Sequence, residues 1–177
     1  MKSRSIFLAS LAVLAVLVVF SVLLATRDPA PGATDVRSPL IGHPAPPVSG
    51  VTLSGAHLSL AQDHGHIVVL TFWASWCPPC QQEAPELSTF AWQQRPAGVD
   101  VIGVVWEDTV ASARAFQTDY GSLYPSIVDP NGAIANSYGV TGPPTTFVIS
   151  PTGTVVASLL GATTTAQLDR LVAEARA

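Results

Sequence analysis

Cys77 and Cys80 are the two cysteines of this 177-residue chain, and two prolines separate them. Two thiols at this spacing can close a reversible disulfide or supply half of a tetrahedral metal site. They cannot join distant segments of the chain, so the fold must be stabilised by burial alone. The pair therefore predicts thiol chemistry rather than a structural cross-link.

The segments on either side of the cysteines predict how they are positioned. Residues 66–74 form a continuous apolar run, typical of a buried central strand, and residues 79–94 have a helical pattern. Cys77 would then lie at the N-terminus of the helix, where free N–H groups and the helix dipole stabilise a thiolate. Cys80 would lie one turn later on the same face and be more buried. This arrangement predicts Cys77 as the attacking thiolate and Cys80 as the resolving thiol.

Other uses of a cysteine pair fit the surrounding residues poorly. A zinc site would need His64 and His66, which lie at the far end of the predicted strand, about 25 Å away. Haem attachment requires a histidine after the second cysteine, where this chain has Gln81. The peroxiredoxin pattern requires a proline and a threonine or serine at the positions occupied by Leu70 and Ala74.

The N-terminus has the pattern of a membrane anchor. Residues 6–25 carry no charge and could span a bilayer core of about 30 Å as a helix. Lys2 and Arg4 precede this run, which predicts that residues 1–5 stay in the cytoplasm and that the rest of the chain faces outward. A cleaved signal peptide is the alternative, although the run is long for one and Leu23 lies at the −3 position of the cleavage site.

Beyond the anchor, the sequence predicts a linker at residues 26–39 and one α/β domain at residues 40–177, with a mixed sheet flanked by helices. The six basic and twelve acidic side chains after residue 25 argue against nucleic-acid binding. The further elements that we expect are a hairpin at 51–60, strands at 99–106, 126–128, 145–149 and 154–160, and helices at 109–120, 131–138 and from the Thr164–Gln167 capping box onward.

Two motifs carry a resemblance to a known family. Residues 72–80, Phe-Trp-Ala-Ser-Trp-Cys-Pro-Pro-Cys, resemble the thioredoxin active site, and residues 140–147, Val-Thr-Gly-Pro-Pro-Thr-Thr-Phe, resemble its cis-proline loop. With Ile-Gly-His-Pro-Ala-Pro at 41–46 and the anchor, the chain is similar to the TlpA/ResA/CcmG (DsbE) branch over residues 40–177. The resemblance implies a thioredoxin-like fold and a protein disulfide oxidoreductase that uses the Cys77–Cys80 disulfide, with no metal and no other cofactor.

The resemblance also implies which residues contact the substrate. Pro144 would be the cis-proline, and Pro143 would present its backbone to an extended substrate, while Trp76, Pro78 and Pro79 flank the cysteines. A proline at position 143 has no N–H, so pairing with the substrate backbone would keep only the carbonyl bond. We therefore expect a weaker and less selective grip on the substrate.

A third catalytic residue is expected at Glu83. Thioredoxins carry a buried aspartate six residues before the first cysteine, and this chain has Thr71 there. Glu83 follows Cys80 by three residues on the same helix face and matches an acidic position of ResA-like proteins. It is expected to exchange a proton with Cys80.

The resemblance finally implies a role in the cell. Members of this branch reduce cysteine pairs in exported proteins, which favours apocytochrome c as the substrate, during cytochrome c maturation, and a transmembrane thiol carrier as the electron donor. The domain would lie on the periplasmic side of a bacterial cell membrane. Oxidation of exported proteins is the alternative activity, and a binding module with an inert disulfide is the alternative of another class.

Overall fold

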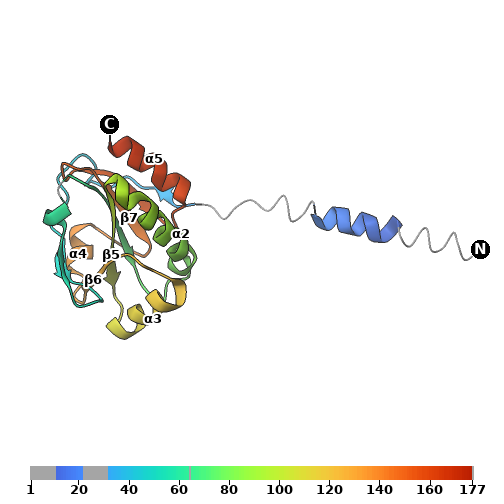
Figure 1. The fold of residues 1–177 in the computed structure, drawn as a ribbon, viewed down its shortest axis with the longest axis horizontal. Helices are drawn as coiled ribbons and strands as arrows, with labels where there is room; N and C mark the ends of the chain where they lie inside the picture. Colours follow the sequence, from blue (N-terminus) through green and yellow to red (C-terminus); the bar gives the residue numbers. More distant parts are fainter. Residues whose placement is uncertain (1–10, 22–31, 64, 177) are drawn as a thin grey trace, which may run out of the picture. The chain divides into compact units, whose positions relative to one another are not determined.

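The computed structural model describes residues 11–21, 32–63 and 65–176 (Figure 1). Residues 11–21 are helical. The other parts of the predicted anchor and the predicted cytoplasmic residues 1–5 lie outside the described residues. Among the helices that the structure describes, none is both long and apolar enough to span a bilayer.

A mixed sheet forms the centre of the compact unit Gly32–Ala177. Its strand order is β1-β8-β7-β4-β5-β6, with β4, β5 and β6 parallel and the other neighbours antiparallel. These strands are β1 Thr34–Asp35, β4 Ile67–Trp73, β5 Val99–Trp106, β6 Ser126–Asp129, β7 Thr145–Ile149 and β8 Val155–Leu160. A separate hairpin pairs β2 Ser49–Val51 with β3 His57–Ser59.

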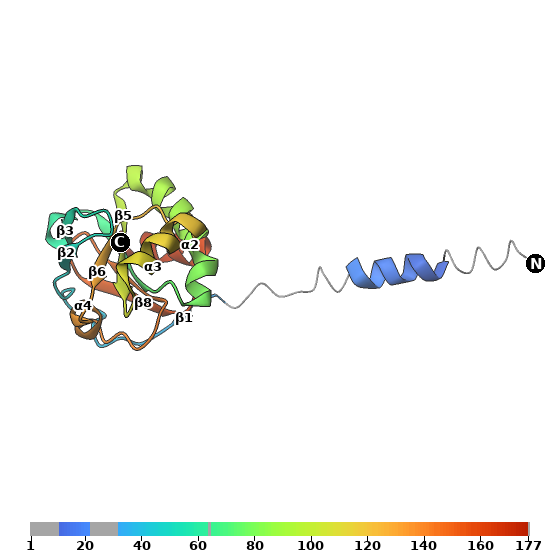
Figure 2. The same cartoon turned by 90° about the horizontal axis from the view of Figure 1, so that it is seen from below.

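Helices cover both faces of the sheet. The α-helices are α2 Pro78–Gln94, α3 Val110–Tyr120, α4 Ala133–Ser137 and α5 Thr165–Ala175, and the short 3-10 helices are η1 Leu60–Asp63 and η2 Arg95–Ala97. Side chains of α2, α3 and α5 share one hydrophobic cluster, and α4 shares the other with residues of the β2–β3 region. Figure 2 shows α4 and the β2–β3 hairpin on the side of the sheet away from α2 and α3.

Strand β4 is buried on both faces, as its apolar run predicted. Val69 and Trp73 belong to the cluster under α2, whereas Leu70 and Phe72 belong to the opposite cluster. Alternate side chains of a strand point to opposite faces, so an unbroken apolar run is stable only where both faces are covered. The predicted mixed sheet flanked by helices is confirmed.

The N-terminal boundary of the domain differs from the prediction. Residues 26–39 were expected to be a linker, but β1 pairs with β8, and Val36 N–H donates to the Ser158 carbonyl at 2.9 Å. Gln167 Nε2 also donates to the Ala33 carbonyl at 2.7 Å. These contacts use main-chain groups, and both residues of β1 are exposed, so no apolar periodicity marks them in the sequence.

Helix caps and turns follow the local sequence signals closely. Thr109, the first residue of the predicted helix 109–120, caps α3, and the Thr164–Gln167 capping box opens α5 as predicted. The predicted hairpin at 51–60 is present, the strands expected at 145–149 and 154–160 pair antiparallel, and α4 is shorter than the predicted helix at 131–138. Within this fold, β4 ends at Trp73 and α2 begins at Pro78, so a short loop joins the central strand to the helix.

Candidate active site

The two cysteines lie where β4 ends and α2 begins, and they form a disulfide with a Cα–Cα distance of 5.3 Å. Cys77 is the N-cap residue of α2, and its Sγ accepts a hydrogen bond from the Cys80 N–H at 3.2 Å. Pro78 and Pro79 occupy the first turn, where a helix can lack N–H donors. The predicted position of Cys77 at the helix N-terminus is confirmed.

Burial does not separate the two cysteines as predicted. Cys77 is 2 % exposed and Cys80 is 1 % exposed, so both sulfurs are covered in the disulfide form. The difference between them lies in the helix: Cys77 is the N-cap and its Sγ accepts the N–H of Cys80, whereas Cys80 is already inside the first turn. Only Cys77 is therefore positioned for the helix terminus to stabilise its thiolate.

The loop before Cys77 is held by the end of the neighbouring strand. Asp108 Oδ2 accepts the Ser75 N–H at 2.6 Å, and Gln81 Nε2 donates to the Ser75 carbonyl at 3.0 Å. The indole N–H of Trp76 donates to the carbonyl of Glu107 at 3.0 Å. These contacts fix the ring of Trp76 beside the disulfide while leaving it 53 % exposed.

Asp108 was not among the site residues predicted from the sequence. Its second oxygen accepts the Thr109 N–H at 2.7 Å, so one carboxylate joins the start of α3 to the active-site loop. The available signal was its position two residues after β5, because the carboxyl ends of parallel strands β4 and β5 lie at the same edge of the sheet.

Glu83 is buried on the same face of α2 as Cys80, as predicted. The side chain is 3 % exposed, and its Oε2 accepts the Thr163 N–H at 2.7 Å and the Thr163 hydroxyl at 3.1 Å. Burial raises the pKa of Glu83 from 4.5 to about 7, and the two hydrogen bonds from Thr163 oppose this rise. A carboxyl group in this state can both accept and return a proton near neutral pH.

Thr163 is the partner of Glu83 that the sequence gave no reason to select. It lies between β8 and α5, 80 positions from Glu83 along the chain. In the sequence it is simply the residue before the capping box that opens α5. Only the packing of α5 beside α2 brings the two residues together.

The position that holds the buried aspartate in thioredoxins is occupied here by Thr71, which is uncharged and pairs with a second threonine. Thr71 is fully buried in β4, and its hydroxyl accepts a hydrogen bond from the Thr146 hydroxyl of β7 at 3.1 Å. Trp73, two residues later, is 1 % exposed, stacks on Phe116 and donates its indole N–H to Ser126. Trp73 is therefore a residue of the hydrophobic core.

The proline loop lies beside the end of β4. Residues Phe72 and Thr145 are register partners, so Pro144, immediately before Thr145, is next to the segment that leads into Cys77. The peptide bond between Pro143 and Pro144 is cis, as predicted for Pro144. Pro144 is buried and its carbonyl accepts the Gly161 N–H at 2.9 Å, whereas Pro143 is partly exposed.

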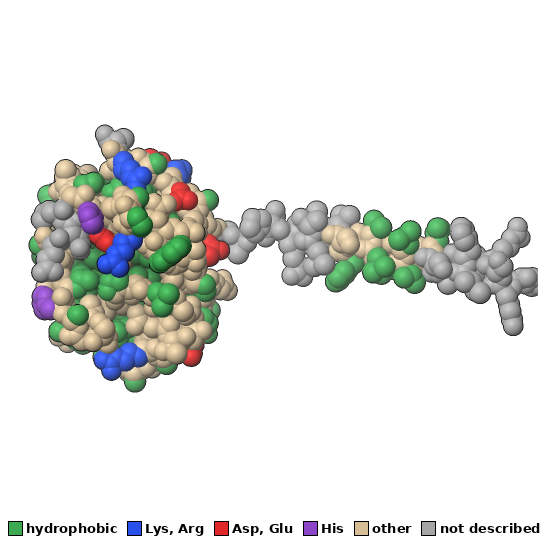
Figure 3. Space-filling view, in the orientation of Figure 1, with side chains coloured by type: hydrophobic (Ala, Val, Ile, Leu, Met, Phe, Trp, Pro, Cys, Tyr) green, Lys and Arg blue, Asp and Glu red, His purple; other side chains and the backbone are tan. Residues whose placement is uncertain are grey.

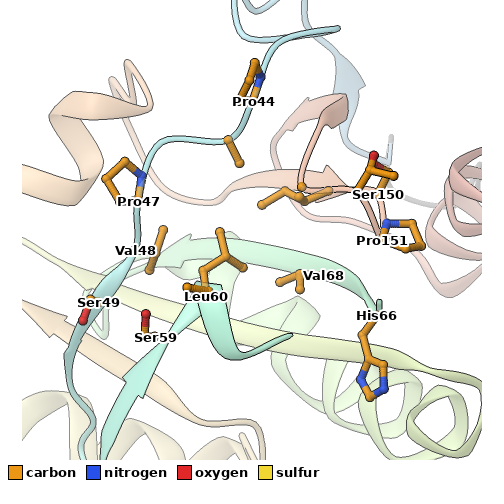
Figure 4. Close-up of a pocket in the computed structure, with 15 residues that line it drawn as sticks. Pro44, Pro47, Val48, Ser49, Ser59, Leu60, His66, Val68, Ser150 and Pro151 are labelled. Carbon is orange, nitrogen blue, oxygen red and sulfur yellow. The ribbon is translucent and has the colours of Figure 1, made fainter. Parts of the chain in front are cut away.

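His66 lies at the opposite end of β4 from the cysteines. Its Nδ1 is 2.6 Å from Asp100 Oδ2, while His64 lies outside the described residues. His66 also lines a cavity of about 330 Å³. Figure 4 shows it with Val48, Leu60 and Val68, which line the same cavity. Neither cysteine lines this cavity, so it is separate from the disulfide site.

The face of the domain shown in Figure 3 carries no basic stripe of the kind typical of nucleic-acid binding. The arginine side chains on this face are scattered singly among uncharged ones. This distribution agrees with the excess of acidic over basic residues in the sequence.

A mixed sheet of this topology, with a cysteine pair at disulfide distance between its central strand and α2, defines a thiol-disulfide oxidoreductase of thioredoxin fold. The chain belongs to the AhpC/TSA family, whose model matches residues 41–158.

Known relatives place the chain more narrowly within this class. It is 33 % identical over 129 residues to the thiol-disulfide oxidoreductase ResA of Bacillus thuringiensis, covering 73 % of this chain and 75 % of ResA. It is 38 % identical over 123 residues to the thiol:disulfide interchange protein DsbE of Allochromatium vinosum, covering 68 % and 66 %. A solved thiol:disulfide interchange protein of Chlorobium tepidum, 28 % identical, superposes with a TM-score of 0.71 over 81 % of this chain and all of its own. These relatives are named for thiol-disulfide exchange, which is the activity that the site defines.

Proposed function

We propose that the protein is a membrane-anchored, periplasmic reductant of cysteine pairs in exported proteins, and that apocytochrome c is its main substrate. The similarity to ResA and DsbE supports this class of function. The observation that carries the reducing direction is the environment of Cys77. Among the described residues, its Sγ accepts a hydrogen bond from Cys80 alone, and Pro78 and Pro79 add neither charge nor donor.

In the proposed reaction, the reduced protein attacks the substrate disulfide. The Cys77 thiolate bonds to one substrate sulfur, and the other substrate sulfur leaves with the electron pair and is protonated. Cys80 then gives its proton to the Glu83 carboxylate and attacks Cys77 Sγ. This step forms the Cys77–Cys80 disulfide and releases the first substrate sulfur as a thiolate, so the substrate gains two electrons.

The oxidised protein must then be reduced again. A periplasmic reductant draws its electrons from the cytoplasm, so we propose a transmembrane thiol carrier as the donor, which transfers two electrons by the same exchange in reverse. The Cys77–Cys80 disulfide is the only redox group that this cycle requires. Because no cation or histidine stands between the cysteines, only the helix terminus favours the thiolate, which keeps the reduction potential low.

Measurement of the reduction potential tests the proposed direction. We expect a reduction potential of about −270 mV, as in thioredoxin, rather than about −120 mV, as in a strong oxidant. The Cys77 pKa should lie only modestly below its ordinary value. The reduced protein should also convert an oxidised Cys-x-x-Cys-His peptide to its dithiol. A reduction potential of about −120 mV, together with rapid oxidation of peptide dithiols, would change the assigned activity from reduction to oxidative folding of exported proteins.

Cell fractionation tests the proposed anchor at residues 6–25. We expect the full chain in the membrane fraction, with the domain accessible to protease from the periplasmic side. Recovery as a soluble periplasmic protein with a new N-terminus close to residue 26 would replace the anchor by a cleaved signal peptide.

A further inference from the structure

The main chain around the disulfide has few hydrogen-bond donors left for a substrate. Pro78, Pro79, Pro143 and Pro144 have no N–H. A peptide that docks in extended form on the proline loop therefore finds no N–H donor at positions 143 and 144, where backbone pairing would otherwise fix it.

Several of the other donors near the cysteines are already used within the protein. The Ser75 N–H donates to Asp108, the Cys77 N–H to the Ala74 carbonyl at 3.3 Å, and the Trp76 indole N–H to Glu107. The Thr145 hydroxyl, directly after the proline loop, donates to the Gly142 carbonyl at 2.6 Å. The groups that flank the sulfurs thus offer a substrate mainly apolar and aromatic surface.

Two tryptophans provide aromatic surface on the side of the disulfide where β4 and β5 end. Trp106 ends β5, and because β5 runs parallel to β4 it lies at the same sheet edge as Trp76. The ring centroids of Trp76 and Trp106 are 6.4 Å apart, with an angle of 49° between the planes. Trp106 is partly buried and packs against the hydrophobic cluster under α4, while the contact with Glu107 holds Trp76 in place.

We infer that Trp76 and Trp106 form a subsite for a planar side chain next to the reacting cysteine of the substrate. The inference rests on the proposed function, since the occupant is part of the polypeptide whose sulfur reaches Cys77. A ring that stacks on Trp76 gains contact area, and this gain needs neither a hydrogen bond nor a charge from the protein. The histidine that follows the second cysteine of a Cys-x-x-Cys-His pair is a planar ring of this kind.

Short cysteine peptides, each activated as a mixed disulfide with the coloured leaving group 2-nitro-5-thiobenzoate, test the subsite. The residue after the cysteine is phenylalanine, histidine, leucine or alanine. When Cys77 attacks the peptide sulfur, the aromatic thiolate leaves with the electron pair, so its colour reports the rate constant. We expect the phenylalanine and histidine peptides to react about 2- to 10-fold faster than the leucine and alanine peptides.

Variants of the tryptophans separate the subsite from general effects. Trp106→Ala should reduce the ratio of phenylalanine to alanine rates to about one, and Trp106→Phe should keep part of the preference. Trp92→Ala is the matched control, because Trp92 is 78 % exposed on α2 and lies outside the site, so the preference should remain. Thermal unfolding and the reduction potential of each variant show whether the fold and the disulfide are intact.

A further arm tests the role of the missing donor. Pro143→Ala supplies an N–H before the cis-proline, so all four peptides should react faster, by about fivefold for one hydrogen bond. Equal rates for planar and non-planar peptides in the parent protein would overturn the subsite, as would loss of the preference in Trp92→Ala. If no peptide reacts with the reduced protein at all, the proposed function fails instead.

Discussion

Replacement of Cys80 by serine is expected to stop turnover and to leave the protein linked to its substrate through Cys77. Cys77 is the N-cap of α2 and retains the helix terminus in this variant, so it can still attack. No thiol remains to break the mixed disulfide, and steady-state reduction of a peptide disulfide should fall below about a thousandth of the parent rate. Mass spectrometry under non-reducing conditions measures the adduct.

The activated peptides make this experiment quantitative. Both the parent and Cys80→Ser should release the coloured thiolate, but only the parent should then release the peptide. Cys77→Ser is the matched control and should give neither colour nor adduct, because Cys80 lies inside the first turn and not at the helix terminus that stabilises a thiolate. Stable adducts in Cys77→Ser and none in Cys80→Ser would exchange the roles of the two cysteines.

Replacement of Glu83 by glutamine is expected to slow resolution about a hundredfold, the lower end of what general acid–base catalysis contributes. The amide oxygen can still accept both hydrogen bonds from Thr163, but the side chain can no longer take the Cys80 proton. In the parent, the rate should rise with pH through about 7 as the carboxylate forms, and this inflection should be absent from the variant.

Glu86→Gln is the control for this substitution, because Glu86 is an exposed acid of the same helix. Its rate should match that of the parent at each pH. A Glu83→Gln variant that keeps the parent rate and the inflection near pH 7 would exclude proton transfer through Glu83.

The raised pKa of Glu83 also predicts how stability changes with pH. Between pH 4.5 and about 7 the folded protein retains a proton that the unfolded chain has lost, so the Glu83 contribution to the free energy of unfolding falls as pH rises. The full loss is on the order of 3 kcal/mol and is reached above pH 7. Relative to the parent, Glu83→Gln should therefore gain stability across this window. Urea unfolding at pH 4.5, 6 and 8 measures the difference, and a pH-independent difference would contradict the cause given for the pKa.

Local sequence signals were sufficient for the central part of the fold. The apolar run ending at Ala74, the helical pattern after Pro79 and the capping box at Thr164 predicted β4, α2 and the start of α5, because each depends on neighbours a few residues away. The position of Cys77 at the helix N-terminus follows from these elements alone. The class of chemistry could therefore be predicted before the structure.

The tertiary structure decided the features that depend on residues far apart in the chain. Thr163 meets Glu83 only because α5 packs beside α2, and their burial sets the pKa that makes Glu83 a candidate proton carrier. Asp108 and Trp106 reach the cysteine loop because β4 and β5 are parallel neighbours. Strand β1 is fixed by main-chain hydrogen bonds to β8, which leave no pattern in side chains. The sequence determined the two thiols and the helix that activates one of them, whereas burial and strand pairing determined the groups that surround them, since these are properties of the packed chain.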